Sequence, residues 1–346
     1  MLTPLFHRWE RRLASATTNR LVRPFEWGQE WIPVNGGGDG RGAREQLEQY
    51  VTRVLADTDA FYTPPPTGAY ELQPARGGEP GRLTFPSALT TPHSENNLVH
   101  ARYFPARAGT RGPRSRRAVL VLAQWNSDAG GHVGLARLLA RFGISALRIS
   151  LPYHDARMPP ELTRADYIVS SNVGRTLEVC RQAVLDARRA IWWLRDQGYE
   201  RIGILGTSLG SCLSMLTASH EPLVRALALN HISPYFADVV WRGLSTLHVR
   251  AGLEGHITLD DLRRLWMPIS PWTFLDRIRD RRTLLVYAKY DLTFPVDLSR
   301  TLVGECGRRG VPFELRVLPC GHYSTGAAPF KYLDAYVLTR FLNANL

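Results

Sequence analysis

The pentapeptide Gly206–Gly210, which reads Gly-Thr-Ser-Leu-Gly, constrains the fold of this chain more than any other feature. The apolar segment Ile202–Leu205 precedes it, and a helical pattern over 209–220 follows it. A serine between such a strand and such a helix stands on a sharp turn that lifts its hydroxyl above the sheet. That turn requires small residues two positions before and after the serine, and both are glycine. We therefore interpret Ser208 as a nucleophile; the alternative is a glycine-rich turn without chemistry.

Apolar strands and helical patterns alternate from about residue 118 onward. The run Ala118–Ala123 is apolar throughout, which is typical of a strand covered on both faces of a parallel sheet. We expect further strands at 98–104, 144–149, 224–229, 283–288 and 311–318, and helices at 131–142, 173–197 and 332–342. This alternation predicts an α/β fold with a mostly parallel central sheet and helices on both faces.

We expect the chain to divide into a main domain at 81–346 and an N-terminal extension at 1–80. Two helices are expected in the extension, near 3–19 and 43–60, and we predict that they pack on the core. The glycine-rich run Gly36–Gly40 between them is interpreted as a flexible loop.

An aromatic-rich segment at about 231–282 lies between two expected strands. It is too long for a single crossover helix, so we interpret it as a helical cap inserted above the sheet. An ordinary excursion packed at the periphery is the alternative.

The formal net charge of +12 does not point to nucleic acid. Only Lys289 and Lys331 are lysines, and the arginines are scattered through many elements rather than gathered in one stripe. The densest cluster lies in a glycine- and proline-containing loop and consists of Arg111, Arg114, Arg116 and Arg117. Attraction to anionic substrates, or weak contact with a membrane surface, stays open; the sequence says nothing of oligomeric state.

Targeting and redox signals are weak. The first residues lack the apolar run of a secretory signal, and no stretch of about 18 apolar residues predicts a membrane span. The four cysteines form no C-x-x-C pair, so we expect free thiols and a cytoplasmic location.

A serine hydroxyl needs a base to become an effective nucleophile. His322 lies between the last expected strand and the closing helix, directly after Gly321. Loops at the carboxyl ends of parallel strands open onto the same crevice, so His322 is the expected base. His231, which follows the strand at 224–229, is the rival, and its position better suits the lining of a pocket.

The base in turn needs a carboxylate that orients it and stabilises its charged form. Asp291 follows the strand at 283–288 and is the expected acid. Asp238 and Asp297 are rivals that also suit solvated surface positions.

An oxyanion hole requires two backbone N–H groups directed at the developing negative charge. One is expected from Leu209, which follows the nucleophile, and the other from Trp125 or Asn126 in the loop after the strand at 118–123. Candidates for the substrate pocket are Gln124, His154, His231 and Trp241. His154 has an alternative role in a turn closed by local hydrogen bonds. We expect neither a metal nor a cofactor.

The serine turn at Gly206–Gly210, Asp291 at the end of a Tyr-Ala-Lys-Tyr-Asp segment, and Gly321-His322 together resemble the α/β-hydrolase superfamily. The resemblance covers about 97–345 and is to serine esterase- or lipase-like members with a helical cap. Many members carry His-Gly after the oxyanion strand, whereas this chain has Gln124-Trp125. The resemblance implies hydrolysis of a small-molecule carboxylic ester through an acyl-enzyme. Amide or peptide hydrolysis, lipid acyl hydrolysis, acyl transfer and a non-catalytic binding role are the alternatives.

Overall fold

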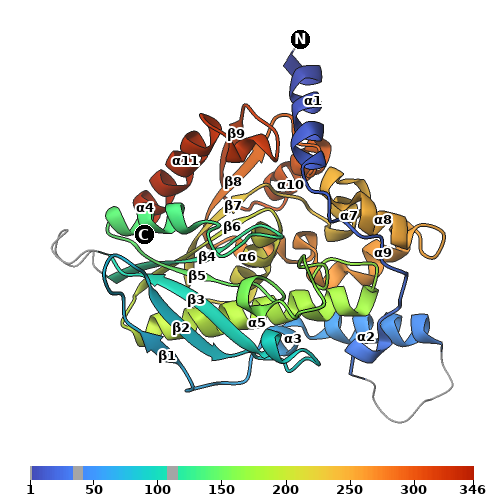
Figure 1. Ribbon diagram of the computed structural model, residues 1–346, viewed down its shortest axis with the longest axis horizontal. Helices are drawn as coiled ribbons and strands as arrows, with labels where there is room; N and C mark the ends of the chain where they lie inside the picture. Colours follow the sequence, from blue (N-terminus) through green and yellow to red (C-terminus); the bar gives the residue numbers. More distant parts are fainter. Residues whose placement is uncertain (1, 34–41, 107–115) are drawn as a thin grey trace.

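The computed structural model describes residues 2–33, 42–106 and 116–346 (Figure 1). The loop expected at Gly36–Gly40, and the cluster members Arg111 and Arg114, lie outside these residues. No helix in the described ranges has the length and apolar character needed to cross a membrane. All four cysteines are buried free thiols.

The described strands form one nine-stranded sheet in the order β1-β2-β3-β5-β4-β6-β7-β8-β9. Their bounds are β1 Glu71–Gln73, β2 Gly81–Pro86, β3 Leu98–Phe104, β4 Arg117–Leu122, β5 Ser145–Ile149, β6 Arg201–Thr207, β7 Val224–Asn230, β8 Arg282–Ala288 and β9 Glu314–Leu318. The pairs from β5 through β9 are parallel, whereas β1, β2 and β3 add an antiparallel edge. The predicted α/β class with a mostly parallel sheet is confirmed; β1 and β2 were not predicted.

The sheet has a hydrophobic core on each face. Along β4, Leu120 and Leu122 belong to one core, and Val119 and Val121 belong to the other. Side chains alternate between the faces of a strand, so a strand with two buried faces is apolar at every position. This is why the apolar run at the start of the alternating region predicted a central strand correctly.

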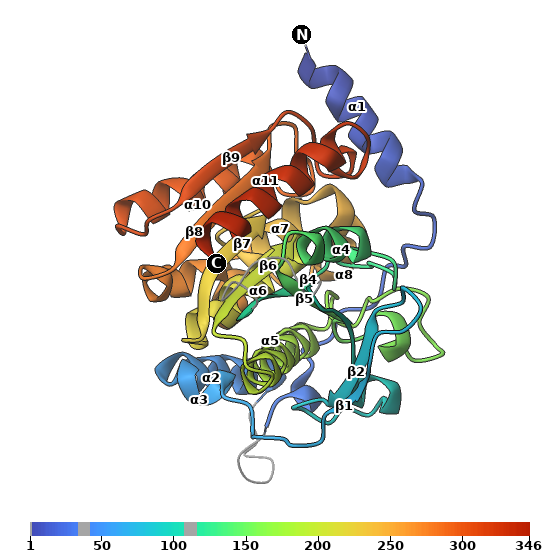
Figure 2. The ribbon, with the colours of Figure 1, turned by 90° about the vertical axis from the view of Figure 1, so that its left-hand side faces the viewer.

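Helices cover both faces (Figures 1 and 2). Helices α5 and α6 contribute to the core that contains Leu120, and α4 and α11 contribute to the opposite core. The bounds are α1 Leu2–Ser15, α2 Ala43–Ala56, α3 Thr58–Tyr62, α4 Val133–Arg141, α5 Val173–Asp196, α6 Leu209–His220, α7 Phe236–Arg242, α8 Leu247–Leu253, α9 Leu259–Leu265, α10 Val296–Arg308 and α11 Phe330–Asn345.

The segment between β7 and β8 contains the short helices α7, α8 and α9 and three 3₁₀ helices. Trp266 in this segment is fully buried, and its indole N–H donates to the carbonyl oxygen of Val173 at the start of α5. The segment is therefore anchored to the main body. The limits proposed for a cap at 231–282 stay a prediction.

The helices of the N-terminal region lie on different parts of the molecule. Helix α1 lies near α11, whereas α2 and α3 lie at the other end of the molecule, near α5 (Figures 1 and 2). The ring of Phe6 in α1 stacks on Tyr290, with centroids 4.4 Å apart, and also approaches Phe330 of α11. Helix α1 thus contacts the loop after β8, the loop that carries Asp291.

Candidate active site

Ser208 occupies the turn between β6 and α6 in a backbone conformation that L-residues rarely adopt, with φ 57° and ψ −119°. Its backbone N–H donates to the carbonyl oxygen of Asn230 over 2.8 Å, which fixes the turn against the end of β7. A Cβ atom on Gly210 would lie 2.2 Å from the carbonyl oxygen of Leu122, and one on Gly206 would lie 2.0 Å from that of Gly210. The two glycines are therefore required for the turn to pack.

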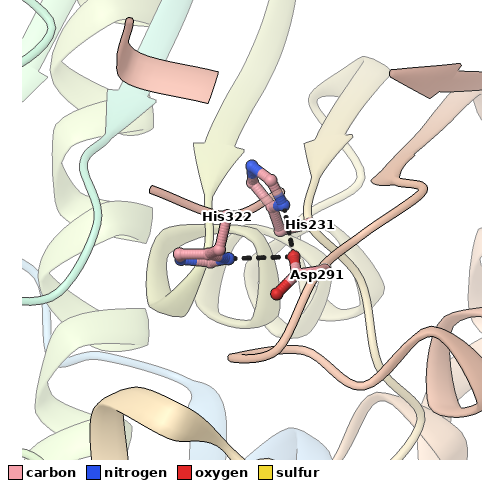
Figure 3. Close-up of side chains that lie close together, drawn as sticks. All are labelled: His231, Asp291 and His322. Atoms are coloured by element: carbon pink, nitrogen blue, oxygen red, sulfur yellow. Dashed lines mark hydrogen bonds and ion pairs between the residues drawn. The ribbon is translucent and has the colours of Figure 1, made fainter. Parts of the chain in front are cut away.

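Asp291 accepts hydrogen bonds from two histidines through the same oxygen (Figure 3). Nδ1 of His322 lies 3.0 Å from Oδ2 of Asp291, and Nδ1 of His231 lies 2.9 Å from it. The rings of the two histidines are 4.3 Å apart, centroid to centroid. The expected acid and both candidate bases therefore form one cluster.

The other carboxylate oxygen of Asp291, Oδ1, accepts the backbone N–H groups of Thr293 and Phe294 over 2.8 and 2.7 Å. Burial alone would raise the pKa of Asp291, but His322 and His231 outweigh it and bring the pKa well below its usual range. Each oxygen of Asp291 thus accepts two hydrogen bonds, an arrangement that favours the ionised carboxylate.

The same cluster has a spacing that is compatible with metal ligation, because one atom from each of His231, Asp291 and His322 lies within 4.8 Å of the others. Each Nδ1, however, lies at hydrogen-bond distance from a carboxylate oxygen, as in a histidine oriented by an acid. The donor set therefore suits proton transfer, and the absence of a metal stays a prediction.

A cavity of about 940 Å³ opens at this end of the sheet and is lined by Ser208, His231 and His322. The expected pocket and oxyanion residues Gln124, Trp125, Asn126 and Leu209 also line it, and their roles stay predictions. Much of the remaining wall is apolar or aromatic, for example Phe236, Val240 and Phe294. The nucleophile candidate and both histidines thus line one open, largely apolar cavity.

The two alternatives for the second oxyanion donor differ in their hydrogen bonds. The N–H of Asn126 donates to Nε2 of His154 over 2.9 Å and is therefore already used. No acceptor is recorded for the N–H of Trp125 or of Leu209 in the described part of the chain. Of the two alternatives, Trp125 is therefore the one whose N–H is available to a substrate.

Two pocket candidates, His154 and Trp241, do not line the cavity, so these two expectations need correction. His154 is buried beneath the loop after β4, with Nδ1 bonded to the carbonyl oxygen of Pro152, which matches its alternative role in a turn. Trp241 lies in α7, under the guanidinium group of Arg250.

The rival acids lie in ion pairs away from the histidines. Asp238 is buried and paired with Arg263, and the exposed Asp297 is paired with Arg242. Both carboxylates are paired with arginine. Of the three candidate acids, Asp291 is the one that is hydrogen-bonded to the histidines lining the cavity.

His154 gives the loop after β4 a testable dependence on pH. Burial lowers the pKa of His154 to about 4, and the ring must be neutral for Nε2 to accept the N–H of Asn126. An unfolded histidine has a pKa near 6.5, so between about pH 6.5 and 4 the unfolded state binds more protons than the folded state. Stability attributable to His154 is therefore present at neutral pH and is lost as the pH falls.

We expect His154→Gln, whose amide oxygen can accept the same N–H, to reduce this dependence. From about pH 7.5 to about pH 5.5, the free energy of unfolding should fall by about 1 kcal/mol more in the wild type than in the variant. Urea unfolding at the two pH values measures the difference. Equal losses in both proteins would show that His154 does not stay neutral in the folded state.

Sequence reasoning missed several residues that line the cavity or contact the loop of His322: Glu10, Thr17, Arg20 and Asp334. Arg20 donates from Nη2 to the hydroxyl of Tyr323 over 2.9 Å. Burial raises the pKa of Asp334 to about 6, and this carboxylate accepts from Nδ2 of Asn230. No local motif marks these residues, because they reach the site from the two chain ends.

The Ser208 turn, the carboxylate shared by two histidines and the cavity lie together at one end of the parallel sheet. A scan of protein-family models finds no match to the sequence, and no curated protein matches it. Solved structures do match the fold. An acetyl xylan esterase from Paenibacillus sp. R4 aligns over 94% of this chain and 100% of its own, with 16% identity and a TM-score of 0.62.

Two further structures extend the comparison. Acetyl xylan esterase 1 from Thermoanaerobacterium sp. JW/SL YS485 aligns over 96% of this chain and 98% of its own, with 15% identity and a TM-score of 0.58. An acylaminoacyl peptidase from Pyrococcus horikoshii aligns over 80% of this chain with 14% identity and a TM-score of 0.59, but the match covers only 42% of that longer protein. The chain has the α/β-hydrolase fold.

Proposed function

We propose that the protein is a serine hydrolase that cleaves carboxylic esters through an acyl-enzyme. The observation that carries this proposal is the strained Ser208 turn, which lines the same cavity as His322, while His322 is bonded through Nδ1 to the buried Asp291. A hydrogen bond at Nδ1 leaves Nε2 of His322 as the nitrogen that exchanges protons with the serine.

In this mechanism Ser208 Oγ attacks the ester carbonyl as His322 removes its proton. Asp291 keeps the imidazole in the required tautomer and stabilises the imidazolium. His322 then protonates the leaving alcohol, and a water molecule, activated by the same histidine, releases the acid from Ser208.

The negative charge of the tetrahedral intermediate would be stabilised by the N–H groups of Leu209 and Trp125. Both residues line the cavity, and the N–H of Leu209 belongs to the first turn of α6, where the helix dipole favours negative charge. The hydrogen bond from Asn126 to His154 supports the choice of Trp125.

The substrate class follows from the cavity wall. Its apolar and aromatic lining suits an ester with an apolar acyl or aryl group. Amide hydrolysis is the second candidate, because one similar structure is an acylaminoacyl peptidase.

A panel of matched esters and amides with the same acyl groups tests the proposal. We expect kcat/KM for the esters to exceed that for the amides, with aryl and medium-chain esters ahead of charged ones. Preferential amide cleavage would contradict the ester assignment and leave the serine mechanism intact.

His231 is the rival base, and its environment differs from that of His322. The His231 side chain is 1% exposed and that of His322 is 13% exposed. The backbone N–H of His231 donates to Val286, and its carbonyl oxygen accepts from Ser211, so both backbone groups of His231 are fixed. We propose that His231 orients Asp291 and that His322 moves the proton.

We therefore expect His231→Leu, whose side chain has no donor, to lower kcat about tenfold, because Asp291 loses one of its donors while His322 stays in place. Steady-state ester hydrolysis by the folded variant measures this. A loss as large as that of a nucleophile variant would instead make His231 the base.

A further inference from the structure

Glu10 of α1 is a fully buried carboxylate that contacts the loop of His322. Its Oε2 accepts the backbone N–H of Tyr323 over 2.8 Å, and its Oε1 accepts that of Ser324 over 2.9 Å. These residues are the next two after His322. The two oxygens of one side chain therefore fix consecutive peptide groups beside the expected base.

The approach of Glu10 to this loop is close. A Cβ atom on Gly321 would lie 2.3 Å from Cδ of Glu10, so the residue before His322 must be glycine for the carboxylate to reach its donors. The loop is also closed by Ser324, whose hydroxyl accepts the N–H of Gly321 over 2.8 Å. Glu10 and Gly321 therefore fit each other although they lie near opposite ends of the sequence.

The same N-terminal segment also contacts the loop that carries Asp291, and it makes a second contact with the loop that carries His322. Phe6, one turn before Glu10, stacks on Tyr290, the residue before Asp291. After the helix, Arg20 donates to the hydroxyl of Tyr323. The segment thus contacts the loops of both Asp291 and His322, which arise from different strands.

We propose that Glu10 is a positioning residue for His322, an inference that rests on the proposed serine hydrolase function. A general base works only within hydrogen-bond reach of the proton that it removes, and a misplacement of about 1 Å costs about 100-fold in rate. The Glu10 carboxylate sets the path of the backbone that carries His322. The N-terminal helix is therefore part of the catalytic apparatus.

Two variants of Glu10 remove its contacts in steps. A glutamine side chain offers one acceptor oxygen, so Glu10→Gln should leave one of the two N–H groups unpaired, and Glu10→Ala should leave both. We expect kcat to fall about tenfold in Glu10→Gln and further in Glu10→Ala, with KM nearly unchanged. Glu10→Asp keeps both oxygens on a shorter side chain and should retain more activity than Glu10→Ala.

The control is Arg11→Gln on the same helix, because Arg11 is exposed and should tolerate the change. Hydrogen–deuterium exchange of a peptide spanning 319–326, measured without substrate, reports whether the amides of the loop lose protection. Relative to the wild type, we expect faster exchange of this peptide and a lower kcat in both Glu10→Gln and Glu10→Ala. The control Arg11→Gln should match the wild type in both measurements.

Unchanged kcat in a folded Glu10→Ala protein, even at a lower melting temperature, would overturn the inference and leave Glu10 a stabilising residue only. Unchanged exchange of the loop peptide would overturn it as well. Because exchange needs no turnover, these outcomes are separate from failure of the hydrolase proposal, which would leave the wild type itself inactive.

Discussion

Ser208→Ala is expected to lower kcat for ester hydrolysis by at least about 10⁴-fold while leaving the fold intact. The hydroxyl at this position is the only group that the proposed mechanism uses to form the acyl-enzyme. Ser208 bonds to its surroundings mainly through the backbone, whose N–H donates to Asn230, and alanine keeps that bond. The measurement is steady-state hydrolysis of an aryl ester, with circular dichroism to verify folding.

Ser219→Ala is a matched control for this experiment. Ser219 lies near the other end of α6, where its hydroxyl donates to the carbonyl oxygen of Met215 inside the helix. It does not line the cavity, so its loss should leave kcat unchanged. If Ser208→Ala hydrolysed the ester at the wild-type rate, a group other than Ser208 would be the nucleophile.

Asp291→Asn is expected to lower kcat about 10⁴-fold, because the hydrogen bonds around residue 291 turn the amide NH₂ group toward His322. Oδ1 accepts the N–H groups of Thr293 and Phe294, so in the variant the amide oxygen is fixed at this position. The amide NH₂ then lies where Oδ2 was, opposite Nδ1 of both His322 and His231. A donor facing Nδ1 of His322 stabilises the tautomer whose proton is on Nε2, which cannot act as a base.

Asp297→Asn is the matched control, because Asp297 forms an exposed ion pair with Arg242 that contributes little to stability. We expect its kcat to equal that of the wild type. The pH–rate profile adds a second readout, since Asp291→Asn should change its shape once His322 no longer acts as the base. A loss of less than about tenfold in Asp291→Asn would contradict the assigned role of Asp291.

The fold was predictable because its signals are local. The buried strand β4 is apolar at each position from Ala118 to Leu122, and the turn around Ser208 is a short motif with a steric requirement. The edge strands β1 and β2 escaped prediction because β1 is short and exposed, and β2 alternates buried and exposed residues over only six positions. Such segments become strands because a neighbouring strand is there to pair with them. Their own sequence pattern does not distinguish a strand from a loop.

The site was predictable only in part. The order of the predicted strands along the chain placed Asp291 and His322 at strand ends. In the structure the two side chains are hydrogen-bonded to each other. That His231 bonds to the same oxygen depends on the register of β7 against β8, which the sequence does not display. The role of Glu10 could not be predicted, because the local sequence around residue 10 or residue 324 does not indicate that the two are in contact.

The most direct test of an activated serine is labelling with a fluorophosphonate probe, followed by intact mass measurement of the wild type and of Ser208→Ala. We expect one adduct per wild-type chain and none on the variant. A folded wild-type protein without an adduct, or an adduct that persists in Ser208→Ala, would contradict the claim that Ser208 is the nucleophile of a working hydrolase.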